Sequence, residues 1–379
     1  MSLGRIRPIH QLADKRYLVA EYTAAVQVLA DRRMSNDPAN GAVLHPDITS
    51  QSVVSQRSST SMQMCDGQRH TRLRRAVAPA LTPRRYDVAL TRMRRQAEDL
   101  LDALRARGGG DLVSEFILPL VFGVICDLLG VPVADRDRVL AWAEGSTMPD
   151  AEISTDGSDA LDTYLSSLLA AKAGQPDDDL CSELAAAREA GRLSDSEAVG
   201  TASLMVVAGY ETTVSFLSTS ALTLLMAPCL QQSLAQRPES LPSVIEELFR
   251  YLTPTKGTWT RFAMADVPIG DTVIPAGSAV VVDLVAANRD PERFACPNRL
   301  DPSREDTKHL AFGHGRHYCP GAGLARRQAQ IVLEVLLTHL SELRLAAPVA
   351  ELGWHQNRFS RRPRSLLVTV IDSQSEVAA

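Results

Sequence analysis

Residues 309–330 read HLAFGHGRHYCPGAGLARRQAQ, a stretch with three histidines, four glycines and a single cysteine, Cys319. The part after the glycines has the composition of a helix. A helix starting near Gly321 would direct the positive end of its dipole toward Cys319 and favour the thiolate, the form that binds metals. The glycines let the backbone approach a flat ligand closely, and backbone N–H groups can donate to the sulfur. The stretch therefore favours a metal-binding cysteine.

Three interpretations of Cys319 remain open at this point. His309, His314, His317 and Cys319 have the side chains of a zinc site, although they crowd into eleven residues. An inert buried cysteine is the usual state of an isolated one. The third interpretation is a thiolate ligand to haem iron, which the glycines, the N–H donors and the following helix all favour.

Composition limits the class of protein. The chain has 379 residues, 45% hydrophobic and 22% charged, without a Pro/Gly/Ser linker, so we expect one domain over residues 1–379. A net charge of -5 argues against a nucleic-acid partner. The N-terminal segment has no apolar core of a signal peptide, and no window approaches the ~18 apolar residues of a membrane span, so we expect a cytoplasmic protein. The six cysteines show no regular spacing, which predicts no disulfide scaffold.

A long buried helix is predicted in the middle of the chain. The capping box Ser194-x-x-Glu197 opens an apolar run that lasts to about residue 226, roughly 30 helical residues. Within it lies AGYETT, residues 208–213, which places Glu211 and Thr212 in a core helix. A buried carboxylate needs partners, and a threonine hydroxyl can compete for a backbone carbonyl. The segment is either a satisfied polar kink or a ligand groove with proton-handling groups.

The remaining pattern is helical with few strands. Helical spacing predicts helices over residues 67–81, 85–110 and 117–131. Residues 148–160 read as a mobile loop or lid, and residues 266–291 as paired strands with a Pro-Ala-Gly corner. The fold class is therefore mainly α with a minor β-sheet region. Elsewhere, Glu247 and Arg250 share one helical face, a pairing that is usually a weak surface contact.

Four motifs together resemble a known family. FGHGRHYCPG at 312–321 matches the pattern F-G-x-G-x-[HR]-x-C-x-G, and AGYETT matches A-G-x-[DE]-T-[TS]. EELFR at 246–250 contains an E-x-x-R pair, and HTRLRR at 70–75 contains H-x-x-x-R. In these motifs the chain resembles the cytochrome P-450 superfamily of haem-thiolate monooxygenases, soluble bacterial type, over nearly its whole length. The resemblance implies the cytochrome P-450 fold.

The resemblance also implies roles for individual residues. Cys319 would be the iron ligand of heme b, iron protoporphyrin IX, and Glu211 and Thr212 would deliver protons to dioxygen. Arg299 would join Glu247 and Arg250 in a structural network. The remaining cofactor-binding residues, which would contact the haem or leave room for dioxygen above it, are His70, Arg74, Ala208, Gly209, Arg261, Phe312 and His317.

The implied reaction is hydroxylation or epoxidation of a small organic substrate, a tailoring step in bacterial specialised-metabolite biosynthesis. Electrons would come from NAD(P)H through a ferredoxin or flavodoxin-like donor and its reductase, and a carrier protein would be a further partner if it held the substrate. Oxidative coupling, peroxide-driven oxidation and non-catalytic haem binding are the alternatives. Arg72, Arg75, Arg316 and Arg326 would attract an acidic electron donor or form an ordinary solvated surface. The implied substrate pocket comprises residues 38–64, 145–160, 253–259 and 357–361 together with the central helix.

Overall fold

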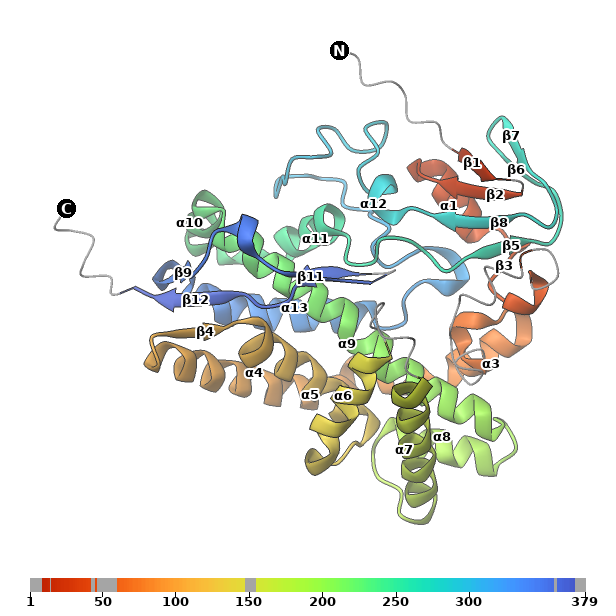
Figure 1. Ribbon diagram of the computed structural model, residues 1–379, viewed down its shortest axis with the longest axis horizontal. Helices are drawn as coiled ribbons and strands as arrows, with labels where there is room; N and C mark the ends of the chain where they lie inside the picture. The colour runs from red at the N-terminus through yellow and green to blue at the C-terminus, as the bar shows by residue number, and fades with distance from the viewer. Residues whose placement is uncertain are drawn as a thin grey trace.

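The computed structural model describes residues 9–13, 15–41, 45, 60–146, 155–357 and 360–371. In Figure 1 the long helix α9 crosses the molecule, with most other helices on one side of it and most strands gathered at one end. The predicted class, mainly α with a minor β-sheet region, is confirmed.

Helix α9 spans Asp195–Leu225, 31 residues, and confirms the long central helix. The predicted capping box is present: the Ser194 hydroxyl accepts from the Glu197 N–H at 3.2 Å, and a Glu197 carboxylate oxygen accepts from the Ser194 N–H at 3.0 Å. Side chains on nearly every face of α9 are buried, because α5, α7 and α13 pack around it. The helix is the axis of the main hydrophobic core.

The other predicted helices are also present, with ends set by proline and glycine. The first ends before Pro79, the second before Gly108, and the third at Gly130, whose φ of 76° is the left-handed cap that glycine favours. The helices are α1 Tyr22–Ala30, α3 Gly67–Val77, α4 Pro83–Ala106, α5 Leu118–Leu129, α6 Arg136–Gly145, α7 Thr155–Gly174, α8 Leu180–Glu189, α10 Pro228–Gln236, α11 Leu241–Leu252, α12 Leu284–Ala287 and α13 Ala322–Leu337.

The predicted loop over residues 148–160 is partly wrong. Helix α7 already begins at Thr155, so residues 155–160 are helical despite their small, acidic composition. The first part of the predicted loop, residues 148–154, lies outside the described residues. The packing of α7 against α6, α8 and α9 accounts for the difference, since tertiary contacts override weak helix propensity.

The strands form small sheets. The largest has the order β1-β2-β8-β5-β3, in which only β2 and β8 pair in parallel. Of the paired strands predicted over residues 266–291, β6, β7 and β8 are present, and the Pro275–Gly277 corner precedes β8, with a φ of 77° at Gly277. The end of that prediction is wrong, because residues 284–287 form the short helix α12, whose first turn is capped by the Asp283 side chain accepting from the Ala286 N–H. The strands are β1 Ile9–Ala13, β2 Arg16–Val19, β3 Met34–Ser35, β4 Gly109–Asp111, β5 Arg261–Ala263, β6 Val267–Ile269, β7 Thr272–Ile274, β8 Ala279–Val282, β9 Leu343–Leu345, β10 Trp354–Gln356, β11 Arg361–Pro363 and β12 Leu367–Val370.

Glu247 and Arg250 of α11 form a fully buried ion pair, with Arg250 Nε and Nη2 donating to the carboxylate at 2.7 and 2.8 Å. The prediction that the Arg299 side chain is the third member of this network is wrong. Arg299 contributes its backbone carbonyl, which accepts from Arg250 Nη2 at 3.1 Å, while its guanidinium pairs with Asp301. The second cation on Glu247 is Arg304, at 3.2 Å. The Arg299 side chain is exposed, so it cannot neutralise a carboxylate inside the core.

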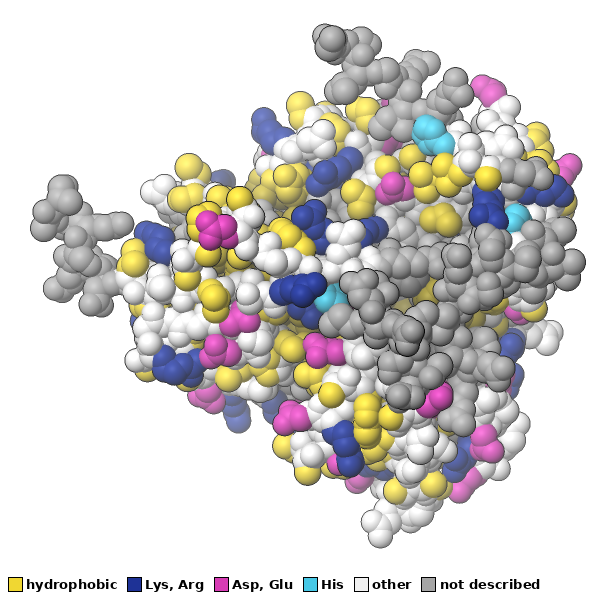
Figure 2. Space-filling model, in the orientation of Figure 1, with side chains coloured by type: hydrophobic (Ala, Val, Ile, Leu, Met, Phe, Trp, Pro, Cys, Tyr) yellow, Lys and Arg dark blue, Asp and Glu magenta, His cyan; other side chains and the backbone are white. Residues whose placement is uncertain are grey.

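The surface charge, the hydropathy of the helices and the cysteines can be compared with the expectations from composition. On the face shown in Figure 2, basic and acidic side chains are interspersed rather than gathered by sign. Among the described residues, no single helix is long and apolar enough to cross a bilayer; only the bent pair α9 and α10 meets that test together, and most of α9 is buried in the core. All six cysteines are free thiols in the structure, three of them buried.

Candidate active site

Cys319 lies in a tight loop that its own backbone holds. The Cys319 N–H donates to the Phe312 carbonyl at 2.9 Å, which closes the loop between the two residues. Gly313 and Gly315 have φ values of 71° and 70°, in the region that glycine adopts without strain. A side chain at Gly315 would lie 2.5 Å from the Leu29 carbonyl, so the loop packs directly on α1. The glycines of the motif therefore shape the loop itself.

The thiol of Cys319 faces two opposing influences. Burial among protein atoms raises its pKa, while a hydrogen bond from the Gly321 N–H and the nearby positive charges of Arg74 and Arg326 lower it. Gly321 is the N-cap of α13, so the predicted helix start beside the sulfur is confirmed. A bound cation would complete the stabilisation of the thiolate that these groups begin.

The zinc interpretation is excluded by the positions of the histidines. His309 lies against Glu246 at 3.3 Å, His317 against Asp66 at 3.2 Å, and His314 is exposed. Within the part of the chain that the structure describes, which includes all four proposed ligands, no three His, Cys, Asp or Glu side chains are grouped as a metal site.

Phe312 connects the cysteine loop to the core through a ladder of aromatic rings. Its ring lies 4.6 Å from that of Phe249 on α11, which stacks on Phe216 of α9 at 3.7 Å. On another side, the Arg326 guanidinium lies 4.4 Å from the Phe312 centroid. The loop position is thus fixed relative to both α9 and α11.

Basic side chains from α3 and the cysteine loop meet next to Asp66. The rings of His70 and His317 are 4.3 Å apart, and Asp66 also pairs with Arg316 at 3.0 Å. Burial and the nearby cations lower the pKa of His70 to about 4. Burial alone would raise the pKa of Asp66, but hydrogen bonds from His317, Ser35 and a backbone N–H hold it well below its usual range. Asp66 is therefore a carboxylate already engaged by its neighbours.

One face of α9 is accessible although the helix is otherwise buried. Ala208 is exposed, and Leu204 and Thr212, one turn before and after it, are partly exposed. The Thr212 hydroxyl donates to the Ala208 carbonyl at a long 3.3 Å. A side chain at Gly209 would meet Ile125 at 2.7 Å, so this glycine also lets α5 pack closely on α9. Ala208 is the most exposed residue of this face.

Glu211 lies on the buried side of α9, and its partners were not expected from the sequence. Ser360 donates to one carboxylate oxygen at 2.7 Å, and Asn357 approaches the same oxygen at 3.4 Å. His355 Nε2 lies 3.6 Å from it. All three residues belong to the β10–β11 hairpin or its tip. No sequence motif marks them; only the polar composition of WHQ and NRFSRR sets the hairpin apart.

Comparison with known proteins supplies the family. A model of the family described as Cytochrome P450 matches residues 161–346. Cytochrome P450 107B1 of Saccharopolyspora erythraea is 39% identical over 370 residues, which cover 96% of this chain and 90% of the relative. The chain belongs to the cytochrome P450 family.

Two further similarities agree with this membership. Mycinamicin IV hydroxylase/epoxidase of Micromonospora griseorubida is 35% identical, over 97% of this chain and 92% of the relative. Among solved structures, the cytochrome P450 enzyme CxnD for C–S bond formation in chuangxinmycin biosynthesis has a TM-score of 0.88 at 32% identity, over 96% of this chain and 92% of that one.

A cytochrome P450 carries haem, and the described residues fit that group. Arg261 of β5 is 3% exposed, yet its Nε and Nη1 atoms make no hydrogen bond to any described residue. Burial, reinforced by the charge of Arg316, lowers its pKa to about 10. A buried guanidinium without an anionic partner destabilises the fold, so the surroundings of Arg261 favour binding of an anion. Haem has two carboxylates, and Arg74, the other arginine predicted to bind them, forms no ion pair with a described residue.

The arginines predicted to attract an electron donor are mostly engaged within the protein. Arg72 pairs with Glu197 at 2.7 Å, Arg316 with Asp66, and Arg326 with Glu246 at 2.6 Å. Only Arg75 is exposed without an ion pair to a described residue. The Arg72 pair joins α3 to α9 and the Arg326 pair joins α13 to α11, which leaves less free positive charge than the sequence suggests.

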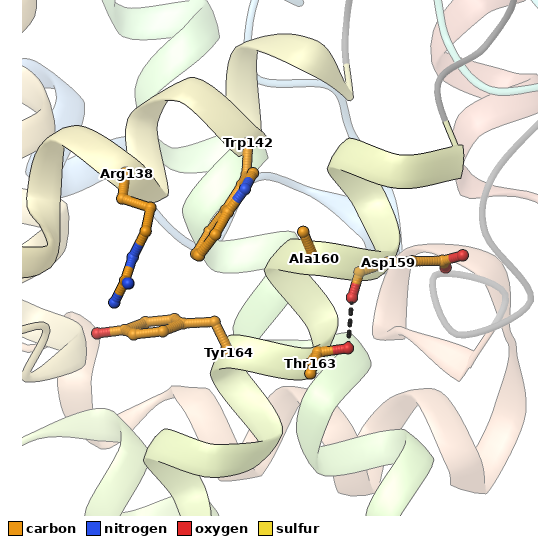
Figure 3. Close-up of a pocket in the computed structure, with 6 residues that line it drawn as sticks. All are labelled: Arg138, Trp142, Asp159, Ala160, Thr163 and Tyr164. Atoms are coloured by element: carbon orange, nitrogen blue, oxygen red, sulfur yellow. Dashed lines mark hydrogen bonds between the residues drawn. The ribbon is translucent and has the colours of Figure 1, made fainter.

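A separate pocket of about 550 Å³ lies between α6 and α7. Figure 3 shows its lining, in which the Arg138 guanidinium lies against the rings of Trp142 and Tyr164, 5.3 and 5.7 Å from their centroids. It includes none of the predicted haem or proton-handling residues, so it is not the haem site. Of the segments expected to line a substrate pocket, residues 42–44, 46–59, 147–154 and 358–359 lie outside the described part of the chain.

Proposed function

We propose that this cytochrome P450 is a haem-thiolate monooxygenase that hydroxylates or epoxidises a small organic substrate in bacterial specialised-metabolite biosynthesis. The observation that carries the proposal is the pairing on α9 of an accessible hydroxyl, Thr212, with a buried carboxylate, Glu211. A protein that only stored haem would have no need for a costly buried carboxylate beside an open helix face. The relative named as a hydroxylase/epoxidase supports the reaction type.

One set of residues in the chain would bind the haem, and another set would transfer protons. Cys319 would hold the haem iron, and Arg261, Arg74, His70 and His317 would hold its carboxylates. The haem supplies the activation of dioxygen by electron donation from the thiolate.

Ala208 keeps one face of α9 open for dioxygen and substrate, and the residues beside it handle protons. The long Thr212 bond to the Ala208 carbonyl is weak enough to be exchanged, so the hydroxyl can turn and donate a proton toward that face. Glu211 then replaces the proton, because a carboxyl is a stronger acid than a hydroxyl.

The electron source is part of the same proposal. NAD(P)H would supply electrons through a separate ferredoxin or flavodoxin-like donor and its reductase, which would place the enzyme in the cytoplasm with its reductant. A substrate tethered to a carrier protein is a variant of the proposal, with the same chemistry at the haem.

The proposal is tested by finding a substrate and following the oxygen atom. Polyketides, terpenoids and peptides are screened for displacement of the iron-bound water in the absorption spectrum, and each hit is incubated with NAD(P)H, a redox pair and ¹⁸O₂. One ¹⁸O atom in the product is expected. Loss of two hydrogens without oxygen would show oxidative coupling instead, and product formed with peroxide but not with NAD(P)H would show a peroxide-driven enzyme. If compounds bind but no product forms with any of these oxidants, the protein is a non-catalytic haem-binding protein.

A further inference from the structure

We propose that His355 of the β10–β11 hairpin passes protons to Glu211 and that Ser360 holds the Glu211 carboxylate in place for this transfer. This inference rests on the proposed function, because it concerns how Glu211 is reloaded after each turnover. His355 acts through Glu211, and Ser360 is a positioning residue.

The geometry brings two unsatisfied buried atoms together. Glu211 and His355 are each 6% exposed. Among the described residues, neither Glu211 Oε2 nor His355 Nε2 has a hydrogen-bond partner. His355 Nε2 lies 3.6 Å from the other Glu211 oxygen, slightly too far for a hydrogen bond. Because an unsatisfied buried polar atom is unfavourable, a small rotation of the imidazole that brings Nε2 within hydrogen-bonding distance of the carboxylate is favoured.

Ser360 sets which carboxylate oxygen is free. Its hydroxyl donates to Glu211 Oε1 at 2.7 Å, while it also lies 3.2 Å from the side-chain carbonyl of Asn357. With Oε1 already occupied, Oε2 is the oxygen left to take up a proton. The hairpin therefore orients the carboxylate as well as contacting it.

A polar route leads outward from His355. His355 and Arg362 are paired across the two strands of the hairpin, and Arg362 Nη2 lies 3.8 Å from a carboxylate oxygen of Glu144 on α6. The Glu144 side chain is 35% exposed, so it reaches solvent. Burial raises the pKa of Glu144, with Arg362 opposing and Glu211 adding to the increase. Glu144 is thus a partly exposed carboxyl whose pKa lies above its usual value.

Burial is the main influence that favours the neutral form of His355. His355 is faced by Glu211 from α9, by Arg362 from β11 and by Arg364 just after that strand. Burial lowers the pKa of His355, the Glu211 charge opposes this, and the two arginines add to it. A neutral imidazole can accept one proton and give up another without leaving its place.

The proton balance is simple. The unprotonated ring nitrogen of His355 takes a proton from a hydronium ion of the solvent, whose O–H bond breaks to leave water, and the ring becomes an imidazolium. The N–H bond at Nε2 then breaks, its electron pair stays on the nitrogen, and an O–H bond forms on Glu211. The ring returns to the neutral form, so no oxidant or further reactant is needed.

The first test measures by NMR how the charge of Glu211 affects the titration of His355. The haem-loaded protein is labelled in its histidines and studied as the reduced, carbon-monoxide-bound form, which is diamagnetic. Glu211→Gln is expected to lower the pKa of His355 further, by about 1, because it removes the carboxylate that favours the imidazolium. His339, which has its own glutamate partner Glu342 at 3.0 Å, serves as the unaffected reference. A His355 titration unchanged by Glu211→Gln would overturn the proposal.

The second test reads proton delivery. NAD(P)H-driven dioxygen consumption without added substrate is measured against pH for wild type, His355→Gln, Ser360→Ala and the control His339→Gln. His355→Gln should reduce the rate about tenfold or more and change the pH profile, because the amide cannot carry a proton. The control should follow wild type. Equal profiles for His355→Gln and wild type would contradict the relay. If the proposed function itself were wrong, wild type would consume no dioxygen while the NMR coupling persisted.

Discussion

At Arg261 a positive charge is buried, and two of its nitrogens have no hydrogen-bond partner among the described residues, which fits a residue that binds an anionic group. Burial lowers its pKa, which measures how unfavourable the charge is there. Glu211 on the buried side of α9 is a similar case with opposite charge, because one of its oxygens is also unsatisfied. In both residues the proposed role, in binding haem or in handling protons, would account for the cost to stability.

Thr212 is the residue at which proton delivery can be separated from folding. Thr212→Ala should leave haem binding and substrate affinity near wild type, because the methyl and backbone still pack in α9. Loss of the hydroxyl should lower product formed per NAD(P)H at least several-fold and raise peroxide release, since a general acid contributes about 100-fold or more. The measurement is product and peroxide per NAD(P)H consumed.

Thr212→Ser is the matched control, because it keeps the hydroxyl. It should retain most of the coupling between NAD(P)H use and product. If the Ala and Ser variants both equal wild type in coupling and rate, the hydroxyl has no part in proton delivery and AGYETT is a structural feature of the helix.

How far single residues could be predicted depends on whether a local motif marks them. Cys319, Phe312 and His317 stand at fixed positions in one short loop, so the sequence places them together. His355 and Ser360 reach Glu211 only because the β10–β11 hairpin packs on α9, about 150 residues away in the chain. The sequence also could not show that Arg304, and not Arg299, forms the ion pair with Glu247. Which of the two arginines is buried depends on the path of the loop, and no local pattern distinguishes them.

At the scale of elements, α11 and the loop after α12 are joined by a buried ion network. Arg250 donates to Glu247 and to the backbone carbonyls of Asn288, Pro297 and Arg299. One side chain thus joins α11 to the end of α12 and to the loop that follows it. The sequence-based expectation of a weak surface contact, from the spacing alone, is wrong because the helix face is covered.

Arg250→Ala should therefore yield little soluble haem protein. It leaves Glu247 buried with only Arg304 and the Asp301 N–H as partners, at a cost of about 3–5 kcal/mol. Arg299→Ala is the matched control. It removes an exposed side chain but keeps the carbonyl that Arg250 uses, so its free energy of unfolding should lie within about 0.5 kcal/mol of wild type. Soluble yield, haem content and denaturant unfolding check both. Equal stability of the two variants would contradict the assignment.

At the scale of the whole molecule, periodicity predicts the helices well because most of them bury one continuous apolar face. Periodicity fails at the start of α7, where the small and acidic residues predict a loop but form a helix. Packing against the neighbouring helices stabilises this part of α7. Periodicity gives no strand order, since pairing β2 with β8 joins residues about 260 positions apart. Both failures concern long-range contacts, which a local pattern does not contain.

The central claim is that Cys319 is the thiolate ligand of a bound haem. The most direct measurement is the absorption spectrum of the reduced, carbon-monoxide-bound protein, taken for wild type and for Cys319→Ser. A thiolate donates far more strongly to iron than a hydroxyl, so wild type should show the strongly red-shifted Soret band of haem-thiolate proteins and the Ser variant should lose it. An unchanged red-shifted band in Cys319→Ser, or a wild-type protein that binds no haem, would contradict the account.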